Sequence, residues 1–191
     1  ILIDTGGKIT YEEEEWEKKN KVYDGSTNTI TFLKSLGITK IDLLIGTHGD
    51  IDHIGYAKNI MKEMSVKNLW LNYNMVNELE EDLLKTKITN QFNKLSLINL
   101  NDTIREDENE SSLVLYFKLE GVNFLMMGDA PKEIERKIAS TYTFPVDILK
   151  IGHHGSKTSS DESFLIKFRP LYAIISAGRN NRYNHPSFET L

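Results

Sequence analysis

The sequence contains no cysteine, so disulfide bonds and thiolate-held metals are excluded, and any metal must be held by histidine and carboxylate side chains. It also contains no apolar stretch approaching the roughly 20 residues that cross a bilayer as a helix. Basic residues are not in excess, because 23 lysines and arginines face 28 aspartates and glutamates, giving a formal charge of −5. This balance argues against a protein that coats nucleic acid, although a local basic patch or bound cations could still bind phosphates.

Length and hydrophobic content set the expected domain organisation. With 191 residues, 39% of them hydrophobic, the chain can bury a sizeable core and does not require two domains. We therefore expect residues 1–191 to form a single domain. The chain begins abruptly on the strand-like Ile1–Ile3, and so we also expect this domain to lack N- and C-terminal parts of a longer protein.

The most informative stretch is Ile41–Gly55, where a predicted strand opens into a loop dense with possible metal ligands. The largely apolar residues 41–45 predict a buried strand that stops at Gly46. Four possible ligands then occupy six positions, namely His48, Asp50, Asp52 and His53. Imidazole nitrogen and carboxylate oxygen are the ligands of hydrolytic zinc and manganese sites. Two acids and two imidazoles packed so closely would repel or titrate without a cation between them.

Three other predicted strands end in residues of the same chemistry. Ile1–Ile3 leads to Asp4, which either begins a turn or orients a ligating imidazole. The strand at 122–128 leads to Asp129, which either starts a helix ahead of Pro131 or binds metal. The strand at 146–151 leads to Gly-His-His-Gly-Ser, where His153 and His154 are poor core residues because buried imidazoles need their own hydrogen-bond partners.

The intervening segments indicate an α/β protein. A helix capped by Ser26 and ended by Gly37, and a second over 54–64, alternate with strands over 41–45 and 66–71, which predicts a βαβ layer. Polar residues 73–93 predict a helix that acts as a surface element or lid. Strands over 112–119 and 122–128 flank Glu120-Gly121 and should form an antiparallel hairpin. A helix ends near Phe168, a last strand covers 171–177, and residues 11–19 should be a solvated face or loop.

All five histidines fall within three of these motifs, which are the loop at 48–53, the pair at 153–154 and a final loop that contains His185. The first motif, His-x-Asp-x-Asp-His, resembles the His-x-His-x-Asp-His signature of the metallo-β-lactamase-fold hydrolases. Its variant with Asp50 is similar to the hydrolase domain of the bacterial competence DNA-uptake proteins (ComEC-like). The Leu-Lys-Ile-Gly-His-His-Gly-Ser stretch and the loop Gly-Arg-Asn-Asn-Arg-Tyr-Asn-His-Pro also resemble that family's patterns.

This resemblance implies an αββα four-layer sandwich with the site at the sheet edge. It implies two divalent metal ions, Zn or Mn, with the following ligands: His48, Asp50, Asp52, His53, Asp129 and one histidine of the 153–154 pair, for which we choose His154 over His153. It implies catalytic roles for Asp52, His153, His185 and Lys157. His185 could bind metal or contact a substrate phosphate, or it could be an ordinary turn residue before proline. Arg179 and Arg182 suit phosphate oxygens. Many superfamily members have a further histidine before the hairpin, where this chain has Asn109, Ser111 and Ser112, and oxygen-rich ligation makes Mn²⁺ as suitable as Zn²⁺.

We therefore predict a metal-dependent phosphodiesterase or nuclease that acts on DNA through a metal-activated water. The alternatives are a hydrolase of a small phosphoester or of a lipid or cell-wall headgroup, and an inactive metal-binding domain. The resemblance also implies a membrane channel domain attached outside this chain. It places the domain at the extracytoplasmic face of the membrane, and without it a cytoplasmic location is expected.

Overall fold

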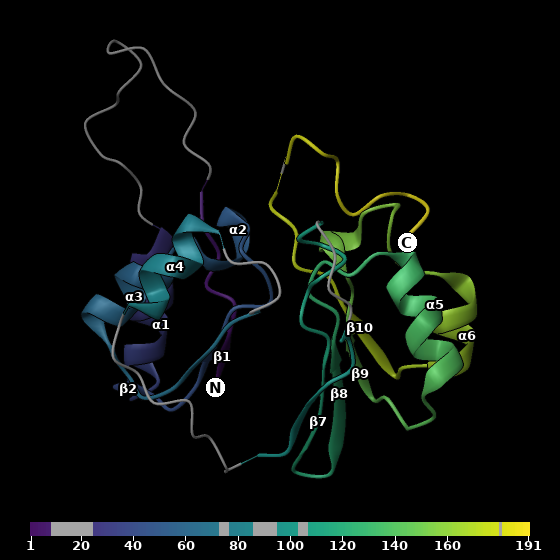
Figure 1. Ribbon diagram of the computed structural model, residues 1–191, viewed down its shortest axis with the longest axis horizontal. Helices are drawn as coiled ribbons and strands as arrows, with labels where there is room; N and C mark the ends of the chain where they lie inside the picture. The colour runs from purple at the N-terminus through teal and green to yellow at the C-terminus, as the bar shows by residue number, and fades with distance from the viewer. Residues whose placement is uncertain (9–24, 73–76, 86–94, 103–106, 180) are drawn as a thin grey trace. The chain divides into compact units, whose positions relative to one another are not determined.

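The computed structural model describes all residues except 9–24, 73–76, 86–94, 103–106 and 180 (Figure 1). Its contacts divide the chain into two compact units, residues 1–92 and 93–191. The first unit contains β1 Leu2–Ile3, α1 Gly25–Ser35, β2 Lys40–Ile41, β3 Leu44–Ile45, α2 Ile51–Ile54, α3 Ala57–Glu63, β4 Ser65–Val66, β5 Leu69–Trp70 and α4 Glu78–Leu84. The second contains β6 Leu97–Asn99, β7 Leu115–Leu119, β8 Val122–Met126, α5 Lys132–Thr141, β9 Ile148–Lys150, the 3₁₀ turn η1 His153–Gly155, α6 Glu162–Phe168 and β10 Tyr172–Ile174.

The strands of the first unit form a parallel sheet in the order β1-β3-β5, with a separate parallel pair β2-β4. The single strand predicted over 41–45 is therefore two short strands. Asn68 causes the break, because its side-chain Nδ2 donates to the carbonyl of Asp42 at 2.7 Å while its own carbonyl accepts from Leu44 N at 2.9 Å. The chain leaves one strand pair at Asp42 and joins the other at Leu44.

The helices of the first unit differ from the sequence expectation at two points. Ser26 is not an N-cap, since α1 begins at Gly25, whereas Gly37 ends the segment as predicted with a φ of +73°. The helix predicted over 54–64 corresponds to α3, and the separate turn α2 precedes it. Tyr56 N donates to the carbonyl of Gly6 at 2.9 Å, and this bond replaces the one that would have continued the α2 ladder.

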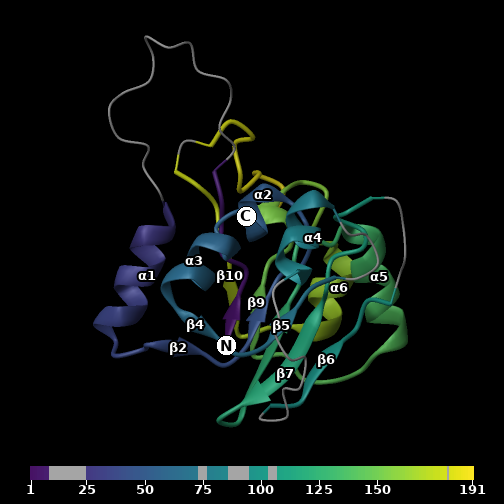
Figure 2. The same ribbon diagram turned by 60° about the vertical axis from the view of Figure 1, so that its left-hand side comes forward.

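The core of the first unit receives apolar side chains from all four of its described helices. They are Ile30 from α1, Ile54 from α2, Ala57 and Ile60 from α3, and Leu83 from α4, all buried against Leu44, Leu69 and Leu71. Figure 2 shows these helices around the short strands of the first unit. The helical cover and parallel strands confirm the predicted βαβ layer. Only Leu83 of the leucines predicted on α4 is buried, because Leu79 and Leu84 are about 40% exposed.

The second unit has a five-stranded mixed sheet in the order β10-β9-β8-β7-β6. Strands β7 and β8 form the predicted hairpin, and Glu120 and Gly121 have φ values of +49° and +86°, as a type I′ turn requires. Strands β8, β9 and β10 are parallel, so their carboxyl ends lie at one edge of this sheet. Both Asp129 and the His153-His154 pair follow strands that end at that edge.

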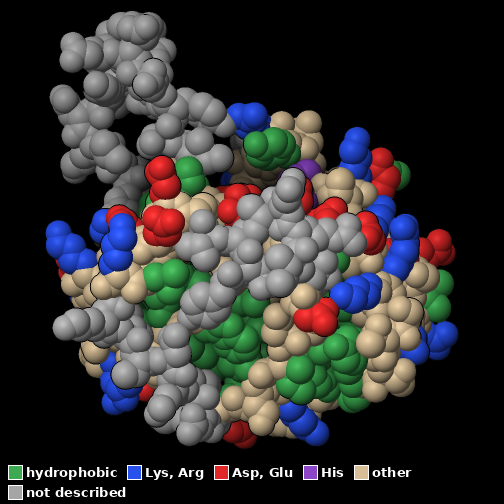
Figure 3. All heavy atoms as spheres, viewed as in Figure 1, with side chains coloured by type: hydrophobic (Ala, Val, Ile, Leu, Met, Phe, Trp, Pro, Cys, Tyr) green, Lys and Arg blue, Asp and Glu red, His purple; other side chains and the backbone are tan. Residues whose placement is uncertain are grey.

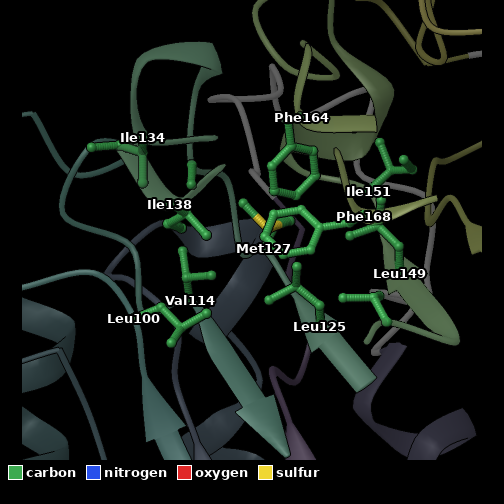
Figure 4. Packing of buried hydrophobic residues seen from close by; sticks show 12 residues of the cluster. Leu100, Val114, Leu125, Met127, Ile134, Ile138, Leu149, Ile151, Phe164 and Phe168 are labelled. Atoms are coloured by element: carbon green, nitrogen blue, oxygen red, sulfur yellow. The ribbon is translucent and has the colours of Figure 1, made fainter. Parts of the chain in front are cut away.

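Helices α5 and α6 pack together on one face of the five-stranded sheet. Ile134 and Ile138 of α5 and Phe164 and Phe168 of α6 meet Leu125, Met127, Leu149 and Ile151 in one buried cluster (Figure 4). This packing fixes the ends of β8 and β9 against the two helices. Strand β6 was not predicted from the sequence, and α5 was expected only as the helix that Asp129 could start; the residue that caps α5 is Pro131.

Residues 11–19 and most of the connections at either end of α4 lie outside the described residues, so the predicted solvated loop and lid stay predictions. No described helix is long and apolar enough to cross a membrane. Acidic and basic side chains of the described residues are interspersed on the face drawn in Figure 3, in keeping with the small net charge of −5.

Candidate metal-binding groups

The first group of ligand-type residues lies where β3 ends and α2 begins. The backbone there is tied to the end of β1, because Thr5 N and Gly6 N both donate to the carbonyl of His53, at 2.6 and 3.0 Å. A Cβ atom on Gly7 would lie 1.7 Å from the carbonyl oxygen of Ile51, so this close approach requires glycine. The Asp-Thr-Gly-Gly turn is thereby pressed against α2, and Asp4 comes beside His53.

Asp4 accepts a hydrogen bond from His53, with Oδ2 lying 2.9 Å from Nδ1. A carboxylate can only accept, so Nδ1 carries the proton and the lone pair of the neutral ring lies on Nε2. The other bonds of Asp4 hold it in place, since Thr47 N donates to Oδ1 at 2.8 Å and Thr47 Oγ1 donates to Oδ2 at 3.0 Å. A hydrogen bond of this kind orients a metal-ligating histidine, and that role of Asp4 stays a prediction.

Thr47 is a residue that sequence reasoning missed. Its hydroxyl lies 3.2 Å from Nδ1 of His48 and 3.3 Å from Nδ1 of His53, so it contacts both imidazoles as well as Asp4. His48 is completely buried, and its Nε2 lies 3.5 Å from Asp50 Oδ2. The two imidazole rings are 4.0 Å apart. Threonine after Gly46 gave no sequence signal, because its role depends on Asp4, 43 positions earlier.

Asn77 is a second residue that was missed. Its Nδ2 donates to the carbonyl of Gly49 at 2.7 Å, and its Oδ1 accepts from Leu79 N and Glu80 N as the N-cap of α4. Asn77 therefore joins the loop between His48 and Asp50 to helix α4. Asp52, the remaining predicted ligand of this unit, is exposed in the first turn of α2.

The second group lies at the carboxyl edge of the mixed sheet. Asp129 follows β8 and is only 3% exposed. Its backbone N–H donates to Ser112 Oγ at 3.2 Å, and the carbonyl of Gly128 accepts from His153 N at 3.1 Å. Ser112 is one of the residues at the position of the missing histidine, and it therefore lies next to Asp129. These bonds bring the ends of β8 and β9 together.

His154 is oriented towards Asp129 by a hydrogen bond on Nδ1, as His53 is oriented by its bond to Asp4. Its Nδ1 lies 2.7 Å from the carbonyl oxygen of Ser176, which can only accept, so the ring lone pair lies on Nε2. That Nε2 is 3.6 Å from Asp129 Oδ2. The backbone of His154 is left-handed, with φ +52° and ψ +21°, a conformation that non-glycine residues adopt at a cost and that clusters at functional sites.

His153 approaches the same carboxylate oxygen less closely, with Nε2 3.9 Å from Asp129 Oδ2. Its Nδ1 lies 3.2 Å from Thr158 Oγ1, which in turn donates to Ser156 Oγ at 3.0 Å. Because the hydroxyl proton of Thr158 is used on Ser156, its oxygen accepts from His153. His153 thus also has its Nδ1 protonated and its Nε2 lone pair directed towards the carboxylate.

His185 joins this group through a loop closed by Asn181. The side chain of Asn181 donates to the carbonyls of Gly178 and His185 and accepts from His185 N. The loop is held against the His-His-Gly-Ser turn, since Ser187 N donates to the carbonyl of Gly155 at 2.8 Å. The His185 ring lies 5.9 Å from the ring of His153. The predicted phosphate contacts Lys157, Arg179 and Arg182 are exposed on these two loops.

Buried Glu135 of α5 positions the segment that follows the two histidines. Its carboxylate accepts from Ser160 N at 2.9 Å and from Asp161 N at 2.6 Å. Burial raises the pKa of Glu135, while these two backbone bonds lower it. Ser160 has a φ of +65°, so the bonds hold a left-handed backbone in place. Sequence reasoning missed this acid because it resembles any helix-surface glutamate.

Each unit thus gathers the predicted site residues that belong to it, apart from the exposed Asp52 of the first unit. The first holds His48, Asp50 and His53 around Thr47 and Asp4, and the second holds Asp129, His153, His154 and His185. The donor set suits a divalent cation, because every imidazole with an assigned tautomer has its proton on Nδ1, tied to an acceptor. A cation bound by both His53 and His154 would take ligands from both units, and such a shared site stays a prediction.

Comparison with known proteins agrees with the motifs. Residues 1–85 match the Metallo-beta-lactamase superfamily. Over 209 aligned positions the chain is 34% identical to ComE operon protein 3 of Bacillus subtilis, an alignment that covers 100% of this chain and 27% of that protein. It is 34% identical to Recombination protein 2 of Haemophilus influenzae over 85% of this chain and 21% of that protein. It is 28% identical to Competence protein ComA of Neisseria gonorrhoeae over 84% and 23%.

The chain spans about a quarter of the length of these relatives. Among solved structures it is similar to a diphosphatase from the PhnP family, with 17% identity and a TM-score of 0.42, over 76% of this chain and 64% of that one. The superfamily match and the alternation of helices and strands confirm the predicted α/β fold class. Residues 1–85 thus match the Metallo-beta-lactamase superfamily, and the chain is similar along its length to the bacterial competence proteins.

Proposed function

We propose that the chain is a metal-dependent phosphodiesterase and that DNA is its substrate. The observation that carries this proposal is the matched treatment of two histidines. His53 and His154 each direct Nδ1–H to a group that can only accept, a carboxylate and a carbonyl, so each presents Nε2 as a ligand atom. Histidines that only support the fold do not need this arrangement. Here two histidines share it, and each lies beside an acidic side chain.

Two divalent cations, Zn or Mn, would be held by His48, Asp50, Asp52, His53, Asp129 and His154. When bound, such ions lower the pKa of a water molecule and neutralise phosphate charge. The oxygen-rich set with Asp50 and without a further histidine makes Mn²⁺ as suitable as Zn²⁺.

Side chains of the protein would bind the phosphates and transfer the proton. The exposed side chains of Lys157, Arg179 and Arg182 would hold phosphate oxygens on either side of the scissile bond. Asp52 and His153 would accept and return the proton of the attacking water. His185, whose ring meets His153, would either ligate or contact the substrate phosphate.

DNA as substrate is supported by the relatives, one of which is named a competence protein and another a recombination protein. Because those proteins are far longer than this chain, we further propose that the domain is attached to a membrane channel in the full protein and works at the extracytoplasmic face. A formal charge of −5 makes cations and a few local basic side chains, rather than the whole surface, responsible for DNA contact.

The test is cleavage by the metal-stripped chain of labelled single-stranded DNA after addition of Mn²⁺ or Zn²⁺. Asp52→Ala and His53→Ala variants are the controls for metal-centre chemistry. Cleavage by the wild-type chain alone, and only with metal, is the expected result. Hydrolysis of a small phosphoester without cleavage of DNA would move the assignment to the alternative substrate class, and cleavage without metal would overturn the mechanism.

A further inference from the structure

The loop that carries His185 also carries an exposed aromatic side chain, Tyr183, whose position is set by several contacts. Asn181 closes the loop with three hydrogen bonds, two donated and one accepted. A Cβ atom added to Gly155 would lie 2.7 Å from Pro186 Cβ, so the loop rests directly on the His-His-Gly-Ser turn. Thr190 Oγ1 donates to the carbonyl of Ser156 at 3.2 Å on the same side. The tyrosine is therefore held by a defined loop.

Tyr183 is the outer member of a line of rings that begins at the buried carboxylate of Asp129. His153 Nε2 is 3.9 Å from Asp129 Oδ2, the His153 and His185 rings are 5.9 Å apart, and the His185 and Tyr183 rings are stacked at 5.7 Å. Tyr183 is 59% exposed as a residue, although the bonds of Asn181 to His185 that anchor its loop are partly buried. The line leads from the candidate metal ligands of the second unit to solvent.

A basic group accompanies the ring. The guanidinium carbon of Arg182 lies 4.9 Å from the centre of the Tyr183 ring, a cation–π contact at an exposed position. Such contacts are weak where water competes, and a phosphate attracts a guanidinium more strongly. Arg182 can therefore leave the ring for a phosphate, and the ring face then becomes available to a flat partner.

From this juxtaposition we propose that Tyr183 is a stacking platform for a nucleobase of single-stranded nucleic acid, with Arg182 binding the adjacent phosphate. The proposal rests on the proposed phosphodiesterase function and specifies its substrate. Aromatic rings beside basic side chains bind unpaired bases without reading their sequence. A lipid headgroup, or a small phosphoester without a base, has nothing to stack on the ring, so this feature favours a nucleic-acid substrate and predicts little dependence on base sequence.

The test compares two labelled 12-mers that have equal numbers of phosphates, one of thymidine and one made of abasic sites. Binding is measured by fluorescence anisotropy, first in EDTA, which blocks metal-dependent cleavage, and then with Mn²⁺. Tyr183→Ala should weaken binding of the thymidine 12-mer about tenfold and leave the abasic 12-mer unchanged, because one base–aromatic stack is lost. Tyr183→Phe should bind like the wild-type chain.

Tyr172→Ala is the matched control, since Tyr172 is a tyrosine of the same unit that is 68% exposed and lies on β10. Equal affinity of the wild-type chain for the two oligonucleotides, or no binding of either, would overturn the proposal. So would an equal loss for both oligonucleotides in Tyr183→Ala. If the chain cleaves DNA but binds both oligonucleotides equally, the proposed phosphodiesterase function stands and the stacking role of Tyr183 fails. If binding depends on the bases but no cleavage occurs, the stacking role stands and the phosphodiesterase function fails.

Discussion

Replacing Asp4 by asparagine should weaken divalent metal binding while leaving the fold intact. Asparagine has nearly the same size and tolerates the left-handed backbone of this position, where φ is +56°. It has only one acceptor oxygen, however, and Asp4 accepts from Thr47 N on Oδ1 and from His53 Nδ1 on Oδ2. If the amide group faces His53, Nδ1 must become the acceptor, and the ring proton then moves to Nε2, the atom that would bind metal.

The expected loss is about 10- to 100-fold in metal affinity, which corresponds to about 1.4–2.8 kcal/mol. Titration of the metal-stripped variant with Mn²⁺ or Zn²⁺ in a calorimeter measures it, with circular dichroism to confirm folding. Asp147→Asn is a matched control, because Asp147 Oδ2 also accepts two hydrogen bonds, both 2.7 Å long, from Asn123. Wild-type affinity in Asp4→Asn, or an equal loss in Asp147→Asn, would refute the assignment of His53 as a ligand held by Asp4.

Three stability predictions can be checked by urea unfolding. Asp161→Ala should lower the free energy of unfolding by about 1 kcal/mol, because it removes the N-cap of α6. Asp161→Asn should keep most of the N-cap's contribution, because asparagine is also a good N-cap. Bonds from Ser163 and Arg136 lower the pKa of Asp161, so its contribution to stability is present above pH 3.8 and declines as the pH falls below that value. The difference in unfolding free energy between the wild-type chain and Asp161→Ala should therefore be smaller at pH 3 than at pH 7, and an equal difference at both would contradict this. Gly121→Ala should cost about 1 kcal/mol because φ there is +86°. Phe164→Ala should cost about 3–5 kcal/mol, since the ring is completely buried.

The features that sequence predicted well depend on neighbours in the chain. The β7-β8 hairpin follows from the two turn residues Glu120 and Gly121. The positions of Asp129 and His154 after strand ends follow from apolar runs that stop at small or polar residues. The α/β fold class followed from the alternation of predicted helices and strands, together with the resemblance to the metallo-β-lactamase-fold hydrolases.

The features that sequence missed depend on contacts between distant residues. The break between β2 and β3 is made by Asn68, 26 positions after Asp42. The division between α2 and α3 requires the carbonyl of Gly6. Glu135 differs from an ordinary helix-surface acid only because two backbone N–H groups, 25 and 26 positions later, meet its carboxylate. None of these partners is apparent in a local pattern.

The backbone strain at His154 allows its structural and chemical roles to be separated. Its φ of +52° and ψ of +21° cost a residue with a Cβ atom about 1–2 kcal/mol, a cost that glycine avoids. His154→Gly should therefore be more stable than His154→Ala by about 1 kcal/mol in urea unfolding, whereas calorimetric titration should find the same weakened metal binding in both. If His154 served only to shape the turn, the glycine variant would retain metal binding and cleavage. Equal stability of the two variants would instead mean that the left-handed conformation is not held in the folded chain.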